Sequence, residues 1–129
     1  WHCTNLTSAP VLPATTLAEG CYSYMFSDCT NLTSAPELPA TTLAVHCYYS
    51  MFSGCTKLST VTMLAPKSEI ETKTYCVLNW LYDAGTDNIV TRTLIVKDEA
   101  AYNALVDKGY LPDIWKKDQC TVENYTPKP

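Results

Sequence analysis

The chain has 129 residues, of which 47% are hydrophobic and 17% charged, so it is long enough for one folded domain and too apolar for a disordered segment. Nine Lys and Arg against 13 Asp and Glu give a net charge of −4 without a basic cluster, which argues against nucleic acid as a partner. No apolar run reaches the roughly 18 residues that a transmembrane helix needs.

The first half of the chain is a repeated sequence. Residues 3–28 and 29–54 align over 26 positions, of which twenty are identical, and a third copy begins in register at Cys55 before it becomes degenerate. The frame resumes at Cys76, where CVLNWL replaces CYYSMF. One such unit buries too little apolar surface to offset its loss of backbone entropy, so we expect successive units to stack on one another.

Each unit predicts a short strand, an irregular crossover and a short helix. Cys, Leu and Ala recur at every third position in residues 29–35, and Pro36 ends this strand because proline has no N–H group to donate. The sequence ELPATTLA that follows has no clear period. In residues 47–52, CYYSMF, two apolar pairs stand four residues apart, which indicates one face of a helix.

The C-terminal segment carries local signals of a strand, a helix and a second strand. TLIVKDEAAYNALVDKGY predicts a strand and then a helix with Asp98 as its N-cap and Gly109 as its stop. An Asp side chain accepts hydrogen bonds from free helix N–H groups, and Gly readily adopts the left-handed conformation that follows a helix. The second strand is expected in CTVENY, residues 120–125.

The seven cysteines follow the repeat. Cys3, Cys29 and Cys55 are one repeat apart, as are Cys21 and Cys47. Buried cysteine packs as a small hydrophobic residue, and no C-x-x-C pair is present to suggest a zinc site. We therefore expect stacked free thiols, with no metal and no other cofactor.

The unit C-T-x-L-T-x-A-P-x-L-P-A-T-T-L-A-x-x-C-Y-x-x-M-F resembles the leucine-rich repeats of BspA-type bacterial surface proteins, relatives of the treponemal leucine-rich repeat class. The resemblance is close over residues 3–54 and loose over 55–82. It implies an α/β fold, namely a right-handed leucine-rich-repeat solenoid with short parallel strands and short helices, closed by a C-terminal strand-helix-strand cap. It also implies a bacterial cell-surface or secreted location and no catalytic residues.

The same resemblance divides the chain into leucine-rich repeats at residues 1–82 and a C-terminal capping segment at residues 83–129. The repeats comprise two regular units, 3–28 and 29–54, and a degenerate unit, 55–82. Because the chain opens at the end of a unit without a visible polar cap, we expect further repeats upstream in a longer protein. Alternatively, Trp1 belongs to an N-terminal cap.

Two sets of residues are candidates for ligand contact. In stacked parallel strands, the residues that flank the buried Leu and Ala would form columns on a concave face. Tyr24 and Tyr49 stand where the two copies differ, and an exposed tyrosine can anchor a protein or a sugar through its flat ring and hydroxyl, although packing against a neighbouring unit explains them equally well. The candidate ligand-facing residues are Ser8, Val11, Ser34, Glu37, Thr60, Met63, Tyr24 and Tyr49.

Recognition is expected where the two copies differ, because the identical positions build the core. In the second copy the altered positions are Glu37, Val45, His46, Tyr49, Ser50 and Gly54.

No residue pattern indicates catalysis, so we do not expect an enzyme. His2 and His46 have no serine or carboxylate in a recognisable catalytic motif, and His46 is expected to face solvent. The sequence favours a non-enzymatic binding or adhesion module that presents its solenoid face to a host or extracellular-matrix protein. Two alternatives stay open: a structural spacer or capping fragment without its own ligand, and a carbohydrate-binding module that uses exposed tyrosines.

Overall fold

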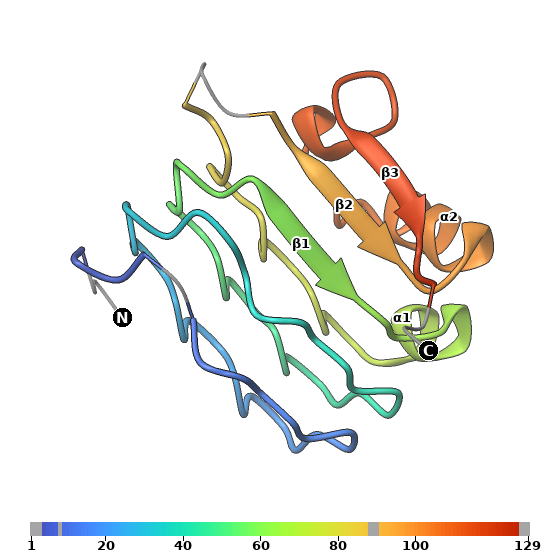
Figure 1. Ribbon diagram of the computed structural model, residues 1–129. Helices are drawn as coiled ribbons and strands as arrows, with labels where there is room; N and C mark the ends of the chain where they lie inside the picture. The colour runs from blue at the N-terminus through green and yellow to red at the C-terminus, as the bar shows by residue number, and fades with distance from the viewer. Residues whose placement is uncertain (1–3, 8, 88–90, 127–129) are drawn as a thin grey trace.

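The computed structural model describes residues 4–7, 9–87 and 91–126 (Figure 1). The candidate Ser8 lies outside the described residues, as do His2 and Cys3. In the described part of the chain, the regular elements begin at residue 60. In order they are β1 (Thr60–Met63), α1 (Lys67–Thr72), β2 (Thr93–Val96), α2 (Glu99–Asp107), the 3-10 helix η1 (Asp113–Trp115) and β3 (Thr121–Asn124).

The strands form a parallel sheet in the order β1-β2-β3. Thr60 pairs with Thr93, and Thr93 pairs with Thr121, so the strands begin level with one another. Leu94 and Val96 are fully buried and alternate with half-buried residues, so one face of β2 belongs to the core. Figure 1 shows α1 and α2 near the carboxyl ends of β1 and β2, where the two helices contact each other.

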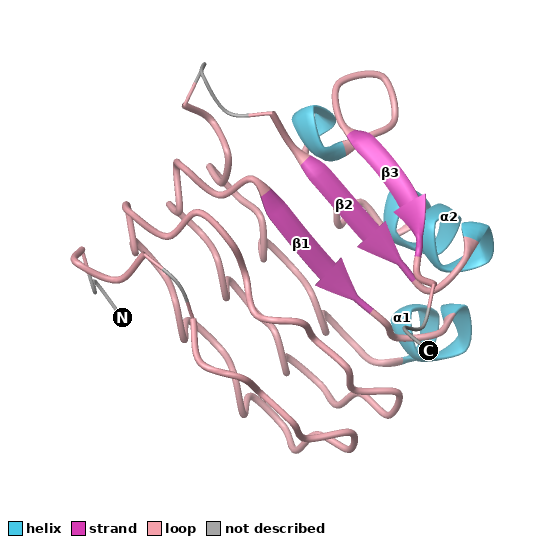
Figure 2. Cartoon of the chain, viewed as in Figure 1, coloured by secondary structure: helices cyan, strands magenta, loops and turns pink. Residues whose placement is uncertain are grey.

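The leucine-rich-repeat solenoid predicted from the sequence is wrong. The fold is an open sheet of three parallel strands with two α-helices, and the described residues before Thr60 contain no helix or strand (Figure 2). Among the described residues of the first two units, parallel pairing is limited to isolated bridges, such as Ser34 with Thr60 and Leu38 with Met63. Prolines at positions 10, 13, 36 and 39 remove backbone donors from these segments, so a continuous strand ladder does not form there.

The helix predicted at residues 47–52, like its counterpart in the first unit, is replaced by a ladder of turns. Successive N–H groups alternate between two kinds of partner. The Met51 N–H donates to the Tyr48 carbonyl in its own unit (3.1 Å), whereas the Phe52 N–H donates to the Trp80 carbonyl in the next unit (2.9 Å). Half of the hydrogen bonds that a helix would keep within itself therefore join neighbouring units.

Every fourth residue of this turn ladder has a left-handed backbone, which explains why no helix forms. In the second unit, φ is 55° at His46, 52° at Ser50 and 79° at Gly54. A left-handed residue breaks the i to i−4 hydrogen bonding of a right-handed helix. We call residues 20–28, 46–54 and 75–83 the three rows of the ladder. The left-handed residues of the other two rows are Gly20, Tyr24 and Asp28, and Tyr75, Asn79 and Asp83.

The third unit is displaced by one residue relative to its sequence alignment. Leu38 pairs with Met63, whereas the alignment places it beside Leu64. The shift arises around Pro36, where the second unit has one residue more than β1 between successive bridges, as in a β-bulge. A shift by one residue turns side chains to the opposite face of a strand, and Met63 is accordingly fully buried.

The C-terminal segment forms the strand, helix and strand that its local signals predict. The Asp98 carboxylate accepts a hydrogen bond from the Ala101 N–H at 2.9 Å, which caps α2. The helix ends before Gly109, whose φ is 73°, and the Tyr110 N–H donates to the Leu105 carbonyl at 2.9 Å, as in a Schellman motif. The two strands are β2 and β3, and they belong to the open sheet rather than closing a solenoid.

A buried cluster of side chains joins the repeated units to the C-terminal segment. Trp80 and Trp115 are fully buried within it. The Trp80 indole N–H donates to the Tyr110 carbonyl at 2.8 Å, and the Trp115 indole N–H donates to the Ala84 carbonyl at 2.9 Å. These bonds satisfy the polar end of each indole, so both rings contribute their full apolar area to the core.

Free thiols are confirmed for the cysteines that the structure describes. Cys21 is exposed, whereas the other described cysteines are buried. Burial raises the pKa of the Cys47 thiol to about 11 and of the Cys55 and Cys76 thiols to about 12, because it disfavours the thiolate. The free cysteines are Cys21, Cys29, Cys47, Cys55, Cys76 and Cys120.

Candidate functional site

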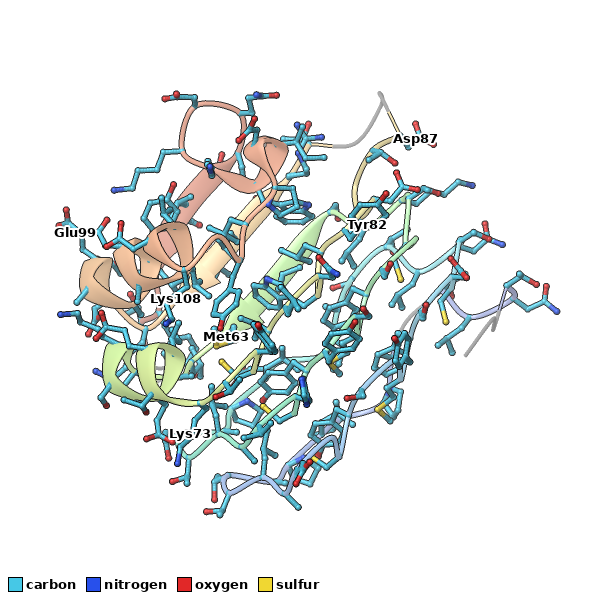
Figure 3. All side chains as sticks on the ribbon, turned by 180° about the vertical axis from the view of Figure 1, so that it is seen from behind. Met63, Lys73, Tyr82, Asp87, Glu99 and Lys108 are labelled. Atoms are coloured by element: carbon cyan, nitrogen blue, oxygen red, sulfur yellow. The ribbon has the colours of Figure 1, made fainter. Side chains whose placement is uncertain are left out.

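A surface depression lies over the beginning of the three rows, and we call it the aromatic depression. It has a volume of about 710 Å³, and its lining residues are Glu19, Gly20, Ser23, His46, Tyr49, Tyr75 and Leu78. The Gly20 N–H donates to the Val45 carbonyl (3.0 Å), and the His46 N–H donates to the Thr74 carbonyl (3.2 Å). These bonds bring together residues from three distant parts of the sequence. In Figure 3 the labelled Lys73 lies just before the third row and Tyr82 lies near its end. The depression is lined by Tyr75 and Leu78, so it lies toward Lys73.

Three aromatic rings meet in the depression. The His46 ring centroid lies 5.4 Å from that of Tyr49, with the two planes at 88°, and 5.7 Å from that of Tyr75, with the planes at 31°. Tyr24 lies at the margin, with its centroid 5.4 Å from that of Tyr49 and the planes at 66°. Edge-to-face contacts at these separations are favourable for aromatic rings, so each ring restricts the orientation of the next.

Polar contacts fix the backbone and the side chains around these rings. The Ser23 hydroxyl donates to the His46 carbonyl at 2.6 Å. A hydrogen bond with the Tyr49 side chain is the main reason that the pKa of Tyr24 is raised, and partial desolvation acts in the same direction. Glu19 is exposed and contributes a carboxylate to the rim.

The sequence creates this cluster through an exchange between the two copies. The first copy reads Ser23-Tyr24 where the second reads Tyr49-Ser50. The Tyr24 N–H donates to the Tyr49 carbonyl (2.9 Å), so each tyrosine lies beside the serine that occupies its own position in the neighbouring row. The small side chain leaves room for the ring. Two tyrosines therefore contact each other across rows although they stand at different positions of the repeat.

Of the predicted ligand-facing residues, the structure brings Tyr24 and Tyr49 together. Tyr24 is 38% exposed and Tyr49 is half-buried. By contrast, Tyr22 and Tyr48, which share one repeated position, stack in parallel with their centroids 6.0 Å apart, and Tyr48 is almost fully buried. The two tyrosines that stand where the copies differ thus reach the surface, and the shared tyrosine position packs against the core.

The predicted strand-face candidates lie elsewhere and do not form one site. Ser34 and Glu37 are exposed and Thr60 is half-buried, whereas Met63 is fully buried and cannot contact a ligand. Val11 is 84% exposed and shares a smaller depression of about 270 Å³ with Glu37, lined largely by prolines. The prediction that Met63 faces a ligand is therefore wrong, and the one-residue shift of β1 is the reason.

Among the lining residues that were not predicted as ligand-facing candidates are His46, Tyr75 and Glu19. His46, which was expected to face solvent, is half-buried between two tyrosines. Tyr75 is 50% exposed and Glu19 is exposed. A signal existed for each: Glu19 and His46 stand where the copies differ, and Tyr75 precedes Cys76 just as His46 precedes Cys47.

No protein-family model matches the chain, and comparisons with curated proteins and with solved structures give no significant match. Among residues 4–7, 9–87 and 91–126, no three His, Cys, Asp or Glu side chains gather as a metal site would require. Within the same described residues, no helix has the length and apolar character needed to cross a membrane. The aromatic depression is therefore interpreted from its own geometry.

Proposed function

We propose that this chain is a non-enzymatic binding module of a bacterial cell-surface or secreted protein, and that the aromatic depression recognises a host or extracellular-matrix protein. The observation that carries the proposal is the convergence of His46 and Tyr49 from the second unit with Tyr75 from the third on one open surface. Tyrosines dominate the energetics of many protein interfaces because they combine a large apolar ring with a hydroxyl. Tyr75 is 50% exposed, so a large part of its side chain remains available to a partner.

Two potential nucleophiles near the depression support a role in binding rather than catalysis. The Ser23 hydroxyl donates to a backbone carbonyl, whereas a catalytic serine needs a base to accept its proton. The Cys47 thiol is fully buried, and its raised pKa keeps it protonated at neutral pH, whereas the thiolate is the reactive form. The proposed bacterial location rests on the resemblance of the units at residues 3–28 and 29–54 to BspA-type repeats.

Surface plasmon resonance with the whole chain against a panel of matrix and serum proteins tests the proposal. Tyr75→Ala is expected to weaken binding to the recognised protein at least tenfold, which corresponds to about 1.4 kcal/mol. Tyr82→Ala is the matched control, because Tyr82 is 65% exposed and belongs to the same row but does not line the depression. Its affinity should stay within twofold of the parent chain.

Two results would contradict this function. The first is the absence of saturable binding to every protein of the panel, as a structural spacer would show. The second is binding that Tyr75→Ala and His46→Ala leave unchanged, which would place recognition elsewhere. Circular dichroism of both variants establishes that they are folded before their affinities are compared.

A further inference from the structure

We infer that the group held in the aromatic depression is a neutral pyranose sugar, carried by the glycosylated partner. This inference rests on the proposed function, because it names the chemistry of the same surface. A pyranose has a face of C–H groups that packs against an aromatic ring and a rim of hydroxyls that need hydrogen-bond partners. The depression offers both kinds of surface side by side.

The apolar contact comes from rings whose positions are already fixed. Tyr49 and Tyr75 both contact His46, at ring separations of 5.4 and 5.7 Å, and the Ser23 hydroxyl holds the His46 backbone from the adjacent row. A stacking ligand would therefore find the rings in place and would lose little free energy in ordering them. Tyr75, at 50% exposure, presents the most accessible ring.

The polar groups of the lining suit hydroxyls better than ions. Glu19 offers a carboxylate that accepts, the His46 imidazole can both donate and accept, and the Tyr75 hydroxyl can do the same. A sugar hydroxyl is itself both a donor and an acceptor, so it can pair with any of these groups. The lining holds one carboxylate and no lysine or arginine, so it carries little charge.

Charged ligands fit this lining less well. A sulfate, phosphate or sialic acid would face the Glu19 carboxylate with no cation among the lining residues. Lys73 stands two residues before Tyr75, but it is not part of the lining and its Nζ lies 3.9 Å from a Glu69 carboxylate oxygen. An ammonium group binds aromatic faces most strongly when it is desolvated. An open depression leaves a bound ammonium group in contact with water, so this interaction stays weak there.

Saturation-transfer-difference NMR with simple ligands tests the inference directly. The probes are the methyl glycosides of glucose, galactose, mannose and N-acetylglucosamine, with the methyl glycoside of sialic acid and tetramethylammonium as charged comparisons. We expect saturation of the ring C–H protons of at least one neutral glycoside, with millimolar affinity. Tyr75→Ala should weaken this binding at least tenfold, whereas Tyr75→Phe, which keeps the ring, should stay within threefold, as should Tyr82→Ala.

The outcomes separate this inference from the proposed function. If a panel protein binds through Tyr75 equally well before and after enzymatic removal of its glycans, the sugar is wrong and the binding role stands. Saturation of tetramethylammonium or of the sialic acid glycoside without saturation of a neutral sugar would overturn the ligand class in the same way. Sugar binding that survives Tyr75→Ala would overturn the location. Silence from every sugar and every protein would overturn both proposals.

Discussion

Replacing Phe52 by alanine should cost a large part of the stability of this fold. The Phe52 ring is fully buried and lies parallel to the Phe26 ring, with the centroids 5.7 Å apart and the planes at 5°. Removing it leaves a cavity between the first two rows of the turn ladder, which the hydrogen bond from the Phe26 N–H to the Met51 carbonyl (2.9 Å) holds at a fixed spacing. Truncation of a buried Phe to Ala costs about 3 to 5 kcal/mol, so we expect the free energy of unfolding to fall by about 4 kcal/mol.

Urea unfolding followed by tryptophan fluorescence measures this loss, because Trp80 and Trp115 are buried in the native state. With a slope of about 2 kcal/mol per molar urea, the midpoint should fall by about 2 M. Tyr82→Ala, which removes a ring that is 65% exposed, should change the free energy of unfolding by less than about 0.5 kcal/mol. A loss below about 1 kcal/mol for Phe52→Ala would show that the stacked rows are not the core of the molecule.

Three further predictions concern backbone strain, capping and burial. Gly85→Ala should lose about 2 to 4 kcal/mol in the same urea titration, because Gly85 has a φ of 65° and a Cβ there would lie 2.8 Å from the Leu58 carbonyl and 2.9 Å from the Trp115 ring; a neutral result would contradict the close packing. Asp98→Ala should lose about 1 kcal/mol at pH 7. The pKa of Asp98 is lowered by a backbone N–H donor, so this contribution is present above the unfolded value near 4 and is lost as the pH falls; equal losses at pH 7 and pH 2.5 would refute it. Burial raises the pKa of the Cys47 thiol to about 11. The contribution of this thiol to the free energy of unfolding is therefore fully present below its unfolded pKa near 8.5, and it is lost as the pH rises through 11. Thiolate absorbance at 240 nm and pH 9.5 should show one thiolate fewer in urea-unfolded Cys47→Ala than in the urea-unfolded parent. The native variant and the native parent should have equal thiolate absorbance at that pH. A difference between the native proteins would argue against burial of Cys47.

The elements that could be predicted from the sequence are those fixed by neighbours in the chain. Asp98 and Gly109 set the ends of α2, and each acts on backbone groups within a few residues of itself. The register of β1 could not be predicted in this way. It depends on the extra residue between Ser34 and Leu38, which belong to another unit, and Met63 is turned into the core as a result.

The candidate site was partly visible in the sequence for a related reason. The exchange between Ser23-Tyr24 and Tyr49-Ser50 marks positions where the two copies differ, and the structure brings the two tyrosines into contact beside the depression. The cluster itself was not visible, because it requires His46 and Tyr75 to occupy one position of neighbouring rows. The spacing between these two residues is 29 rather than 26, since the chain between them includes α1.

The turn ladder escaped prediction because its four-residue period imitates a helix. Apolar residues four apart, such as Cys47 and Met51, fall on one face in either structure. The two structures differ in the backbone at Ser50, which has a φ of 52° and lies in the middle of the predicted helix. Residues that favour the left-handed conformation occupy several of the equivalent positions, among them Gly20 and Asn79, but the hydrogen bonds that stabilise the ladder run to another unit and leave no local signal.

A pair of substitutions at Ser50 separates a helix from the turn ladder without a structure. In a helix, alanine is more favourable than glycine by about 1 kcal/mol, because glycine loses more backbone entropy. At a left-handed position the order reverses, because alanine carries a strain of about 1 kcal/mol that glycine does not. Both substitutions delete the same hydroxyl, which hydrogen-bonds Tyr24, so that loss cancels in the comparison. Urea unfolding should therefore find Ser50→Gly more stable than Ser50→Ala by about 1 kcal/mol. The opposite order would indicate a helix at residues 47–52 and would contradict the backbone arrangement on which the aromatic depression is built.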